Sequence, residues 1–277
     1  MSIPIVFIHQ GDSFYLKYAL LQAKLSNPHC KVFLIGDEAN RKYNSSYVEH
    51  AMISDYDEDV GLFASLYQHI GPNSPAFEAF CIQRLFILRN FMARNELMHC
   101  CCQDSDVLLF MDVSERNFQE CDIIFNHRGM NNLDTLRQFC SMILDHYSER
   151  ALFERIEHFL PSTGCPGISD MVLMDYYNTI FPNEMHMLAS RIDRAYFCGN
   201  INIAEDFETI YDRKKVYRID GNLYCKHMPS GAWVRMNSFH FQGADKMYME
   251  PFFLHNFHYR HQDVYYFDYA SALWQPV

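Results

Sequence analysis

The sequence lacks any hydrophobic run of about 20 residues, the length that a helix needs to cross a bilayer. It also begins without the basic and apolar segments of a secretory signal peptide. These absences predict a cytoplasmic protein with no transmembrane segment. Peripheral attachment to a membrane stays open, as does the cytoplasm of a host cell if the protein is viral.

Cysteine is present, but not in a pattern that builds a disulfide framework or a structural zinc site. The ten cysteines are scattered, three of them are adjacent at positions 100–102, and none belongs to a Cys-x-x-Cys pair. Reduced thiols are therefore the simplest interpretation of the cysteines, which agrees with a cytoplasmic protein.

Basic residues are too few to form a stripe that binds nucleic acid. The formal net charge is −11, which argues against a nucleic acid polymer as a partner. Because like charges repel, an acidic protein that binds a phosphorylated ligand must gather its cations locally or recruit a metal ion. The charge balance thus restricts where such a ligand could bind.

The composition is that of a folded protein. Of the 277 residues, 49% are hydrophobic and 21% are charged. The aromatic content of 16% is high, and aromatic side chains either fill a core or line sites that hold sugars and flat ligands. No internal repeat or low-complexity linker divides the chain, so we expect a single domain over residues 1–277.

The first forty residues alternate between strand and helix patterns. Apolar runs over 3–8 and 31–35 predict buried strands, and helical spacing over 14–25 predicts a helix that is capped by Asp12 or Ser13. A strand, a helix and a strand in this order predict an α/β fold of the Rossmann-like kind, with a mixed, mainly parallel sheet flanked by helices.

Further elements follow along the chain. Residues 40–72 are polar and predicted to be irregular, after which Ser74 and Pro75 form the start signal of a long helix. A third strand is expected to end near Gln103. Beyond it, the pattern predicts helices over 133–147 and 170–180, a loop over 161–167, a hairpin over 216–228 and a strand over 238–242.

Two aspartates, Asp104 and Asp106, follow the third strand. The same Asp-x-Asp pattern occurs twice in the acidic run over 55–59, where no strand precedes it, and there we predict a solvated loop. In open α/β sheets, ligands bind at the carboxyl ends of the strands. Neighbouring carboxylates repel each other unless a cation lies between them, and oxygen ligands suit Mg²⁺ or Mn²⁺ bound to substrate phosphates. We therefore predict a metal site at Asp104 and Asp106.

Arg84 falls on the apolar stripe of the long helix. A guanidinium group in that position needs a carboxylate or phosphate partner, so it either reaches a phosphorylated ligand or braces the two aspartates. Alternatively, the side chain extends to the rim of the stripe and meets solvent. Both interpretations stay open.

A third group of polar residues ends the predicted strand over 238–242. Alternation along the strand puts His240 on the opposite face from its two phenylalanine neighbours. Gly243 then allows a ligand to approach the backbone closely, and Lys246 offers a positive charge to a phosphate. This spacing distinguishes His240 from the other histidines of the chain.

These motifs resemble those of GT-A fold glycosyltransferases, which have a Rossmann-like N-terminal half and an Asp-x-Asp after an apolar strand. The late His-Phe-x-Gly-x-x-Lys motif is similar to that of the glycogenin-type and lipopolysaccharide galactosyltransferase families. The resemblance implies that His240 completes a Mn²⁺ or Mg²⁺ site with Asp104 and Asp106. It also implies that Lys246 binds the diphosphate of a nucleotide-sugar, most simply a UDP-sugar. The Pro-Trp that follows this lysine in glycogenin-type enzymes is absent here.

Small bacterial and viral sugar transferases of this fold provide a second resemblance, over residues 5–40 and 81–110. It implies that His9 and Asp37, at the ends of the first two strands, hold the nucleoside of the donor. Ser105, which lies between the two aspartates, is assigned to the donor as well.

Arg84 and Gly243 complete the expected donor contacts. The resemblance divides the chain into a nucleotide-sugar-binding half over 1–112 and an acceptor-binding half over 113–277. It is weakest over residues 113–160, so the sequence does not identify the acceptor.

Asp170 is the candidate for the catalytic step. It follows a glycine-containing loop and begins a predicted helix, as the acidic base of many inverting GT-A enzymes does. A carboxylate there could deprotonate the acceptor hydroxyl. It could also simply complement the helix N-terminus, and the two roles are compatible.

His255, His258 and His261 follow one another at intervals of three residues. On a helix, the third histidine leaves the face that the first two share, and no carboxylate or cysteine motif accompanies them. We predict that they belong to a packed aromatic tail.

The expected function is therefore a metal-dependent hexosyl- or pentosyltransferase. It would move a sugar from a UDP-sugar to a glycan, glycolipid or protein-linked acceptor, with inversion at the anomeric carbon. A retaining enzyme of the same fold and a non-catalytic carbohydrate-binding protein are the alternatives. A nucleotidyltransferase would need a glycine-rich loop after the first strand, where Gly11 stands alone.

Overall fold

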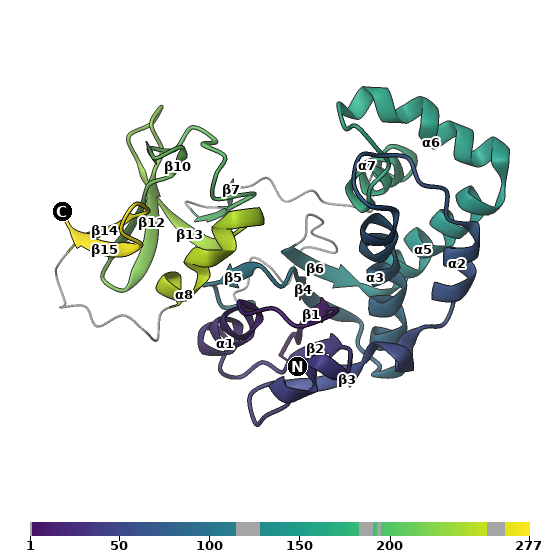
Figure 1. The fold of residues 1–277 in the computed structure, drawn as a ribbon, viewed down its shortest axis with the longest axis horizontal. Helices are drawn as coiled ribbons and strands as arrows, with labels where there is room; N and C mark the ends of the chain where they lie inside the picture. The colour runs from purple at the N-terminus through teal and green to yellow at the C-terminus, as the bar shows by residue number, and fades with distance from the viewer. Residues whose placement is uncertain (1, 115–127, 183–190, 193–194, 254–263) are drawn as a thin grey trace.

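The computed structural model describes residues 2–114, 128–182, 191–192, 195–253 and 264–277. A sheet lies at the centre of the described chain, a group of helices covers one of its sides, and a second sheet lies toward the other side (Figure 1). His255, His258 and His261, which we predict to be part of a packed tail, lie outside the described residues.

Four parallel strands and one antiparallel strand form the central sheet, in the order β3-β2-β1-β4-β6. The parallel strands thus share one edge at which all their carboxyl ends meet. The mixed, mainly parallel α/β sheet that the sequence predicts is confirmed. The strands are β1 (Ile5–His9), β2 (Val32–Gly36), β3 (Glu49–Met52), β4 (His99–Gln103) and the antiparallel β6 (Arg128–Asn132).

Strand β1 is covered on both faces, and the alternation of its side chains divides the core in two. Ile5 and Phe7 belong to one hydrophobic cluster, and Val6 and Ile8 belong to the other. A strand that is covered on both faces needs an apolar residue at every position, which explains its unbroken apolar run. The first cluster continues into α1 (Leu16–Ser26) and the second sheet, and the second cluster continues into the helices.

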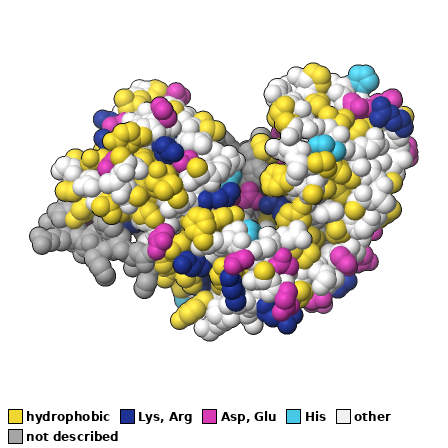
Figure 2. All heavy atoms as spheres, in the orientation of Figure 1, with side chains coloured by type: hydrophobic (Ala, Val, Ile, Leu, Met, Phe, Trp, Pro, Cys, Tyr) yellow, Lys and Arg dark blue, Asp and Glu magenta, His cyan; other side chains and the backbone are white. Residues whose placement is uncertain are grey.

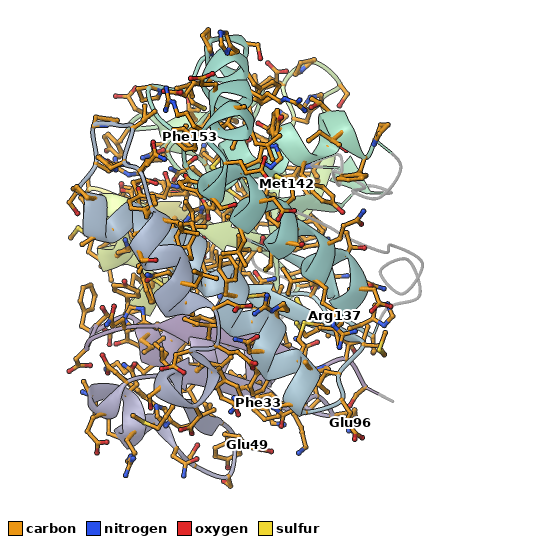
Figure 3. The ribbon with its side chains drawn as sticks, turned by 90° about the vertical axis from the view of Figure 1, so that its right-hand side faces the viewer. Phe33, Glu49, Glu96, Arg137, Met142 and Phe153 are labelled. Carbon is orange, nitrogen blue, oxygen red and sulfur yellow. The ribbon has the colours of Figure 1, made fainter. Side chains whose placement is uncertain are left out.

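The helical group covers the face of the central sheet that Val6 and Ile8 occupy. Figure 3 looks onto these helices and labels Met142 and Phe153, which are both buried. Within the described residues, no helix is both long and apolar enough to cross a membrane. The helices are α2 (Val60–Leu66), α3 (Pro75–Arg94), α5 (Leu133–Ser148), α6 (Arg150–Thr163) and α7 (Asp170–Ile180).

The second sheet is built around β13, which pairs with β12, β8 and β5. Beyond β12 the sheet continues through β11, β14 and β15 toward the C-terminus of the chain, and β7 pairs with β8 at the other edge (Figure 1). The hairpin that we predict over 216–228 is confirmed as β11 and β12. The strands are β5 (Val107–Leu109), β7 (Arg191–Ile192), β8 (Ala195–Phe197), β11 (Val216–Ile219), β12 (Asn222–Lys226), β13 (Trp233–His240), β14 (Tyr265–Asp268) and β15 (Leu273–Pro276).

Three smaller elements belong to the C-terminal half of the described chain. A two-stranded hairpin of β9 (Thr209–Ile210) and β10 (Arg213–Lys214) lies beside the second sheet. The 3₁₀ helix η3 (Gly243–Tyr248) and the short helix α8 (Met249–Phe252) follow β13. Because η3 starts directly after β13, the candidate residues of both elements lie close together.

The predicted cap of the first helix is wrong. Tyr15 occupies the N-cap position of α1 and makes no side-chain capping bond. Both predicted capping side chains have other partners, because Asp12 pairs with Lys42 at 2.6 Å and Ser13 contacts His9 at 3.1 Å. Contacts with other side chains therefore outweigh the local capping preference of these two residues.

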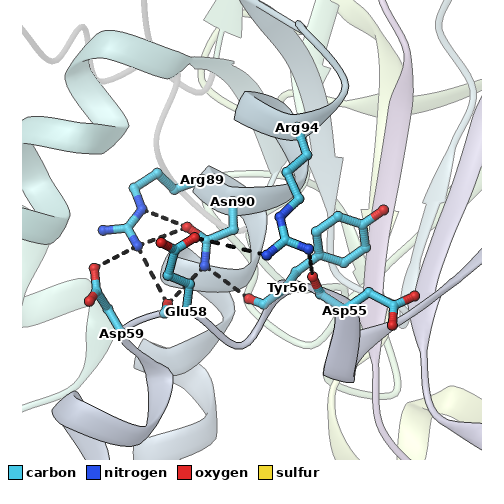
Figure 4. Close-up of polar contacts among 7 residues, drawn as sticks. All are labelled: Asp55, Tyr56, Glu58, Asp59, Arg89, Asn90 and Arg94. Atoms are coloured by element: carbon cyan, nitrogen blue, oxygen red, sulfur yellow. Dashed lines mark hydrogen bonds and ion pairs between the residues drawn. The ribbon is translucent and has the colours of Figure 1, made fainter.

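The prediction that residues 40–72 are irregular is also wrong, since they contain β3, α2 and two 3₁₀ helices. Contacts with α3 organise this segment (Figure 4). The amide of Asn90 donates to the carbonyls of Tyr56 and Glu58 at 2.9 and 2.8 Å, and Arg89 pairs with Asp59 at 3.0 Å. These partners lie about thirty residues away in the sequence, so local pattern could not predict them.

The predicted loop over 161–167 starts three residues too early. α6 continues through Pro161 to Thr163 and ends at Gly164, whose φ of +69° is a left-handed C-cap conformation. Proline is tolerated so close to the helix end because few helical hydrogen bonds follow it.

Candidate functional site

The candidate residues converge at the edge where the parallel strands end. His9 is the last residue of β1, Asp37 directly follows β2, and Asp104 directly follows β4. Because β1 lies between β2 and β4, these three positions are neighbours across the sheet. This edge is the usual ligand position of an open α/β sheet.

Pairing between β5 and β13 adds His240 to this edge. Val107 lies opposite His240, and the Phe241 amide donates to the Asp106 carbonyl at 2.9 Å. The side chains of Asp106 and His240 are therefore adjacent, with 3.2 Å between Oδ1 and Nε2. The two sheets thus meet at the candidate metal site.

Asp104, Asp106 and His240 each present a ligand atom, and the three atoms lie within 4.8 Å of one another. The Nδ1 atom of His240 donates to the Gly199 carbonyl at 2.9 Å, because a carbonyl oxygen only accepts. Its Nε2 atom is therefore the one directed at the carboxylates. Two carboxylates and an oriented imidazole fit a divalent cation such as Mn²⁺ or Mg²⁺.

Lys246 adds a positive charge to the same site. Its Nζ atom lies 3.0 Å from Oδ2 of Asp106 and 5.4 Å from the ring centre of Tyr15. Burial lowers the pKa of Lys246, but the charge of Asp106 and the hydrogen bond to it raise that pKa by more. Lys246 is therefore protonated at neutral pH.

Asp106 is held as a carboxylate by its neighbours. Burial raises its pKa, yet the contacts with His240 and Lys246 outweigh burial and lower the pKa below its ordinary value. A charged Asp106 can pair with a cation, as its predicted role requires.

Arg84 reaches inward from α3 to two carboxylates. Its guanidinium lies 2.6 Å from Asp104 and 3.4 Å from Asp170, and the side chain is 21% exposed. Of the interpretations that the sequence left open, extension to solvent is wrong, and bracing of an aspartate is observed. A direct contact with the donor stays a prediction.

Asp170 begins α7, as the sequence predicts, and makes two polar contacts. Its Oδ1 accepts from the Met171 amide at 2.9 Å, and its Oδ2 faces Arg84. Ser169 is the N-cap, through a bond from the Val172 amide. Asp170 therefore touches the candidate site through Arg84, and its catalytic role stays a prediction.

A close crossing of two loops sets the position of α7. A Cβ atom on Gly167 would lie 2.4 Å from the Cα atom of Gly71 and from the Ile70 carbonyl oxygen. Only glycine fits there without displacement of the backbone. The Ile168 amide also donates to the Ile70 carbonyl at 2.7 Å. This crossing positions the start of α7 near the loop that precedes α3.

His9 and Ser105 contact each other across the end of the sheet. His9 Nδ1 lies 2.9 Å from the Ser105 hydroxyl. Burial lowers the pKa of His9 and outweighs the nearby carboxylates, of which Asp37 has the largest effect. His9 is therefore neutral at neutral pH and acts as a hydrogen-bonding group.

Asp37 is already engaged by the backbone. Its carboxylate accepts from the Gly11 amide at 2.6 Å and from the Ala39 amide at 3.0 Å, and it caps the 3₁₀ helix η1 (Glu38–Tyr43). Its predicted contact with the nucleoside stays a prediction.

Gly243 has a φ of +58° at the start of η3, and it lines the candidate site.

Most of the candidate residues line one cavity of about 620 Å³, a size typical of ligand sites. Figure 2 shows the hollow between the two sides of the molecule, with charged and histidine side chains in it. Of the residues with a predicted role, Asp37 and Asp170 are not in its wall. Those in the wall are His9, Arg84, Asp104, Ser105, Asp106, His240, Gly243 and Lys246.

Sequence reasoning missed part of the apolar wall of the cavity. Phe77 and Phe80 belong to the same apolar stripe of α3 as Arg84; both line the cavity, and Phe77 is 57% exposed. The missed signal is that they precede Arg84 by seven and four residues, which puts all three on one helical face.

Comparison with known proteins adds evidence on the fold. No protein-family model and no curated protein matches the sequence. The chain is structurally similar to mouse xyloside xylosyltransferase 1, with 12% identity, a TM-score of 0.50, and coverage of 70% of this chain and 88% of that one. Together with the mixed sheet, this likeness confirms the predicted GT-A fold.

Two other solved structures are also similar to the chain. One is the PaToxG glycosyltransferase, with 11% identity, a TM-score of 0.41, and coverage of 65% of this chain and 70% of that one. The other is an active-site mutant of LgtC, with 17% identity, a TM-score of 0.33, and coverage of 53% and 65%.

Proposed function

We propose that the protein is a metal-dependent glycosyltransferase that uses a nucleotide-sugar, with UDP as the nucleotide. One observation carries the proposal. Asp104, Asp106 and His240 present ligand atoms within 4.8 Å of one another, in a cavity at the carboxyl edge of a GT-A sheet. Lys246 adds a fixed positive charge to that cavity. This combination of a metal site and a nearby cation suits a bound diphosphate.

In this proposal the three ligand residues hold Mn²⁺ or Mg²⁺, which when bound supplies positive charge to the donor diphosphate. Lys246 stabilises the charge that develops on the leaving nucleoside diphosphate. His9, Ser105 and Gly243 line the wall where the rest of the nucleotide would bind. Since a fixed charge acts more strongly where water is excluded, the partial burial of Lys246 favours this role.

The reaction requires a base for the acceptor. The hydroxyl oxygen of a glycan, glycolipid or protein-linked acceptor attacks the anomeric carbon, and its proton passes to the Asp170 carboxylate. The bond between that carbon and the diphosphate oxygen breaks, and the nucleoside diphosphate leaves with the electron pair. Direct attack of this kind inverts the anomeric configuration. In this proposal, residues 1–112 would mainly bind the donor, and residues 113–277 would mainly bind the acceptor.

Metal removal tests the proposed function directly. The protein is incubated with a panel of UDP-hexoses and UDP-pentoses and Mn²⁺, and the release of free UDP is measured with and without EDTA. We expect release from at least one donor and its loss with EDTA, restored by excess Mn²⁺. Absence of both metal-dependent release and calorimetric donor binding across the panel would contradict the proposal and favour a non-catalytic protein.

A substitution of Asp170 tests the base. Asp170→Asn keeps an oxygen for the Met171 amide but cannot accept a proton at neutral pH, so transfer should fall by about 10²-fold or more. Donor affinity, measured by calorimetry, should stay unchanged. Asp175→Asn on the same helix is the matched control. If Asp170→Asn transfers sugar at the wild-type rate, Asp170 is not the base and only contacts the helix start and Arg84. Retention of configuration would then be the better mechanism.

A further inference from the structure

The orientation of the His240 ring depends on one short segment, residues 198–203. This segment runs beside the end of β13, where the Ile201 amide donates to the His240 carbonyl at 3.0 Å. The Gly199 carbonyl accepts from the His240 Nδ1 atom at 2.9 Å. Asn200 also donates to the side chain of Gln242, which lines the cavity. The segment thus contacts the candidate site at three points.

Lys214, which is not in the cavity wall, holds the same segment. Its Nζ atom donates to the Asn200 carbonyl at 2.7 Å and also to the Ile203 carbonyl. Its backbone amide donates to the Ile201 carbonyl at 2.9 Å. The carbonyls of Gly199 and Asn200 follow each other in the chain, and one binds His240 while the other binds Lys214. The ammonium and the imidazole therefore hold adjacent peptide groups.

Burial of the charged ammonium group of Lys214 costs free energy. The residue is 0% exposed, and a buried ammonium is tolerated only where its donors are satisfied and its charge is paired. Glu205 supplies the charge, with Oε2 at 2.6 Å from Nζ. Two carbonyls accept hydrogen bonds from the ammonium, and the Glu205 carboxylate balances its charge.

Backbone strain accompanies this ion pair. Glu205 and Asp206 have φ values of +48° and +64°, in the left-handed region that residues with a side chain rarely adopt. Such conformations cost free energy and are retained where the surroundings require them. Because an apolar pair of similar size is often as stable as a buried ion pair, stability alone does not account for Lys214 and Glu205.

We propose that Lys214 is a positioning residue for His240. By holding the carbonyls of Asn200 and Ile203, its ammonium group fixes the segment whose Gly199 carbonyl selects the Nδ1–H tautomer. The Nε2 atom then faces Asp106 with its lone pair available for a cation. The inference rests on the proposed function, since it treats Nε2 as a metal ligand. Removal of such a supporting contact lowers metal affinity by about 10–100-fold in other metal sites.

The test removes the charged pair while keeping its volume. The double variant K214M/E205Q is compared with wild type for Mn²⁺ affinity by calorimetry, for stability by urea unfolding, and for the His240 tautomer by ¹⁵N NMR of the metal-free protein. We expect a 10–100-fold rise in the Mn²⁺ Kd and loss of the pure Nδ1–H tautomer. Lys215→Met is the matched control, because Lys215 is adjacent and pairs with its own glutamate, Glu208, at 3.1 Å. Its values should equal those of wild type.

The outcomes separate this inference from the proposed function. A folded K214M/E205Q with wild-type Mn²⁺ affinity and tautomer would overturn the positioning role, and so would an Nε2–H tautomer in the wild type. If the double variant does not fold, Glu205→Gln alone is measured by the same three methods, with the same expected direction. If wild type binds no Mn²⁺, the proposed metal site fails, while the tautomer comparison still decides whether Lys214 orients the ring.

Discussion

Asp106→Asn is expected to lower sugar transfer by about 10³-fold, which corresponds to about 4 kcal/mol of transition-state stabilisation. Asp106 is the residue that His240 and Lys246 share as a partner, since its oxygens lie 3.2 Å from His240 Nε2 and 3.0 Å from Lys246 Nζ. An amide has the same shape but no negative charge, so it binds a divalent cation poorly and no longer holds Lys246 in place. Transfer is measured as UDP release at saturating Mn²⁺.

The acidic run over 55–59 provides the matched control for Asp106. Asp57 belongs to the same Asp-x-Asp pattern, but it is exposed and far from the cavity wall. Asp57→Asn should therefore leave transfer unchanged. The free energy of unfolding of Asp106→Asn should stay within about 1 kcal/mol of wild type, because Lys246 is partly exposed and can turn to solvent. Equal losses of transfer in both variants would contradict the assigned role of Asp106.

Local pattern was sufficient for the elements that carry their own signals. β1 and β2 have an apolar residue at nearly every position because both of their faces are covered. α3 begins at Ser74 and Pro75, and α7 begins at Asp170 after Ser169, as the start signals predict. β3 and α2 were missed because β3 depends on pairing with β2, and α2 depends on packing against α3.

The candidate site likewise combines residues that local sequence pattern indicates with residues that only tertiary contacts bring together. Asp104 and Asp106 could be found from the sequence because they follow a strand at the carboxyl edge of a parallel sheet. His240 is 134 residues beyond Asp106, and its proximity depends on the pairing of β5 with β13. No periodicity in the sequence indicates that pairing, so His240 came from family resemblance. The support of His240 by Gly199 and Lys214 is a tertiary feature that neither source indicated.

Arg84→Leu is expected to have the largest effect on stability. Arg84 is the shared partner of Asp104 and Asp170, whose side chains are 16% and 8% exposed. Removal of one member of a buried ion pair leaves the other charge unpaired, and the loss is about 3 kcal/mol in comparable cases. Here two carboxylates would lose the same partner, and Asp104 would remain beside the charge of Asp106. We therefore expect the free energy of unfolding in urea to fall by about 3 kcal/mol, and transfer to be lost.

Added Mn²⁺ distinguishes lost charge from lost packing in Arg84→Leu. A cation at Asp104 and Asp106 replaces part of the missing positive charge, and a ligand that binds only the folded state stabilises it. The variant should thus regain part of its stability with Mn²⁺, whereas a packing defect would not respond beyond the gain seen in wild type. Arg137→Leu is the control, since this arginine is 53% exposed and pairs with Asp134 on the surface of α5. Its free energy of unfolding should change by less than about 1 kcal/mol. An equally small change in Arg84→Leu would show that the two carboxylates do not depend on Arg84, and the link between Asp170 and the candidate metal site would have to be abandoned.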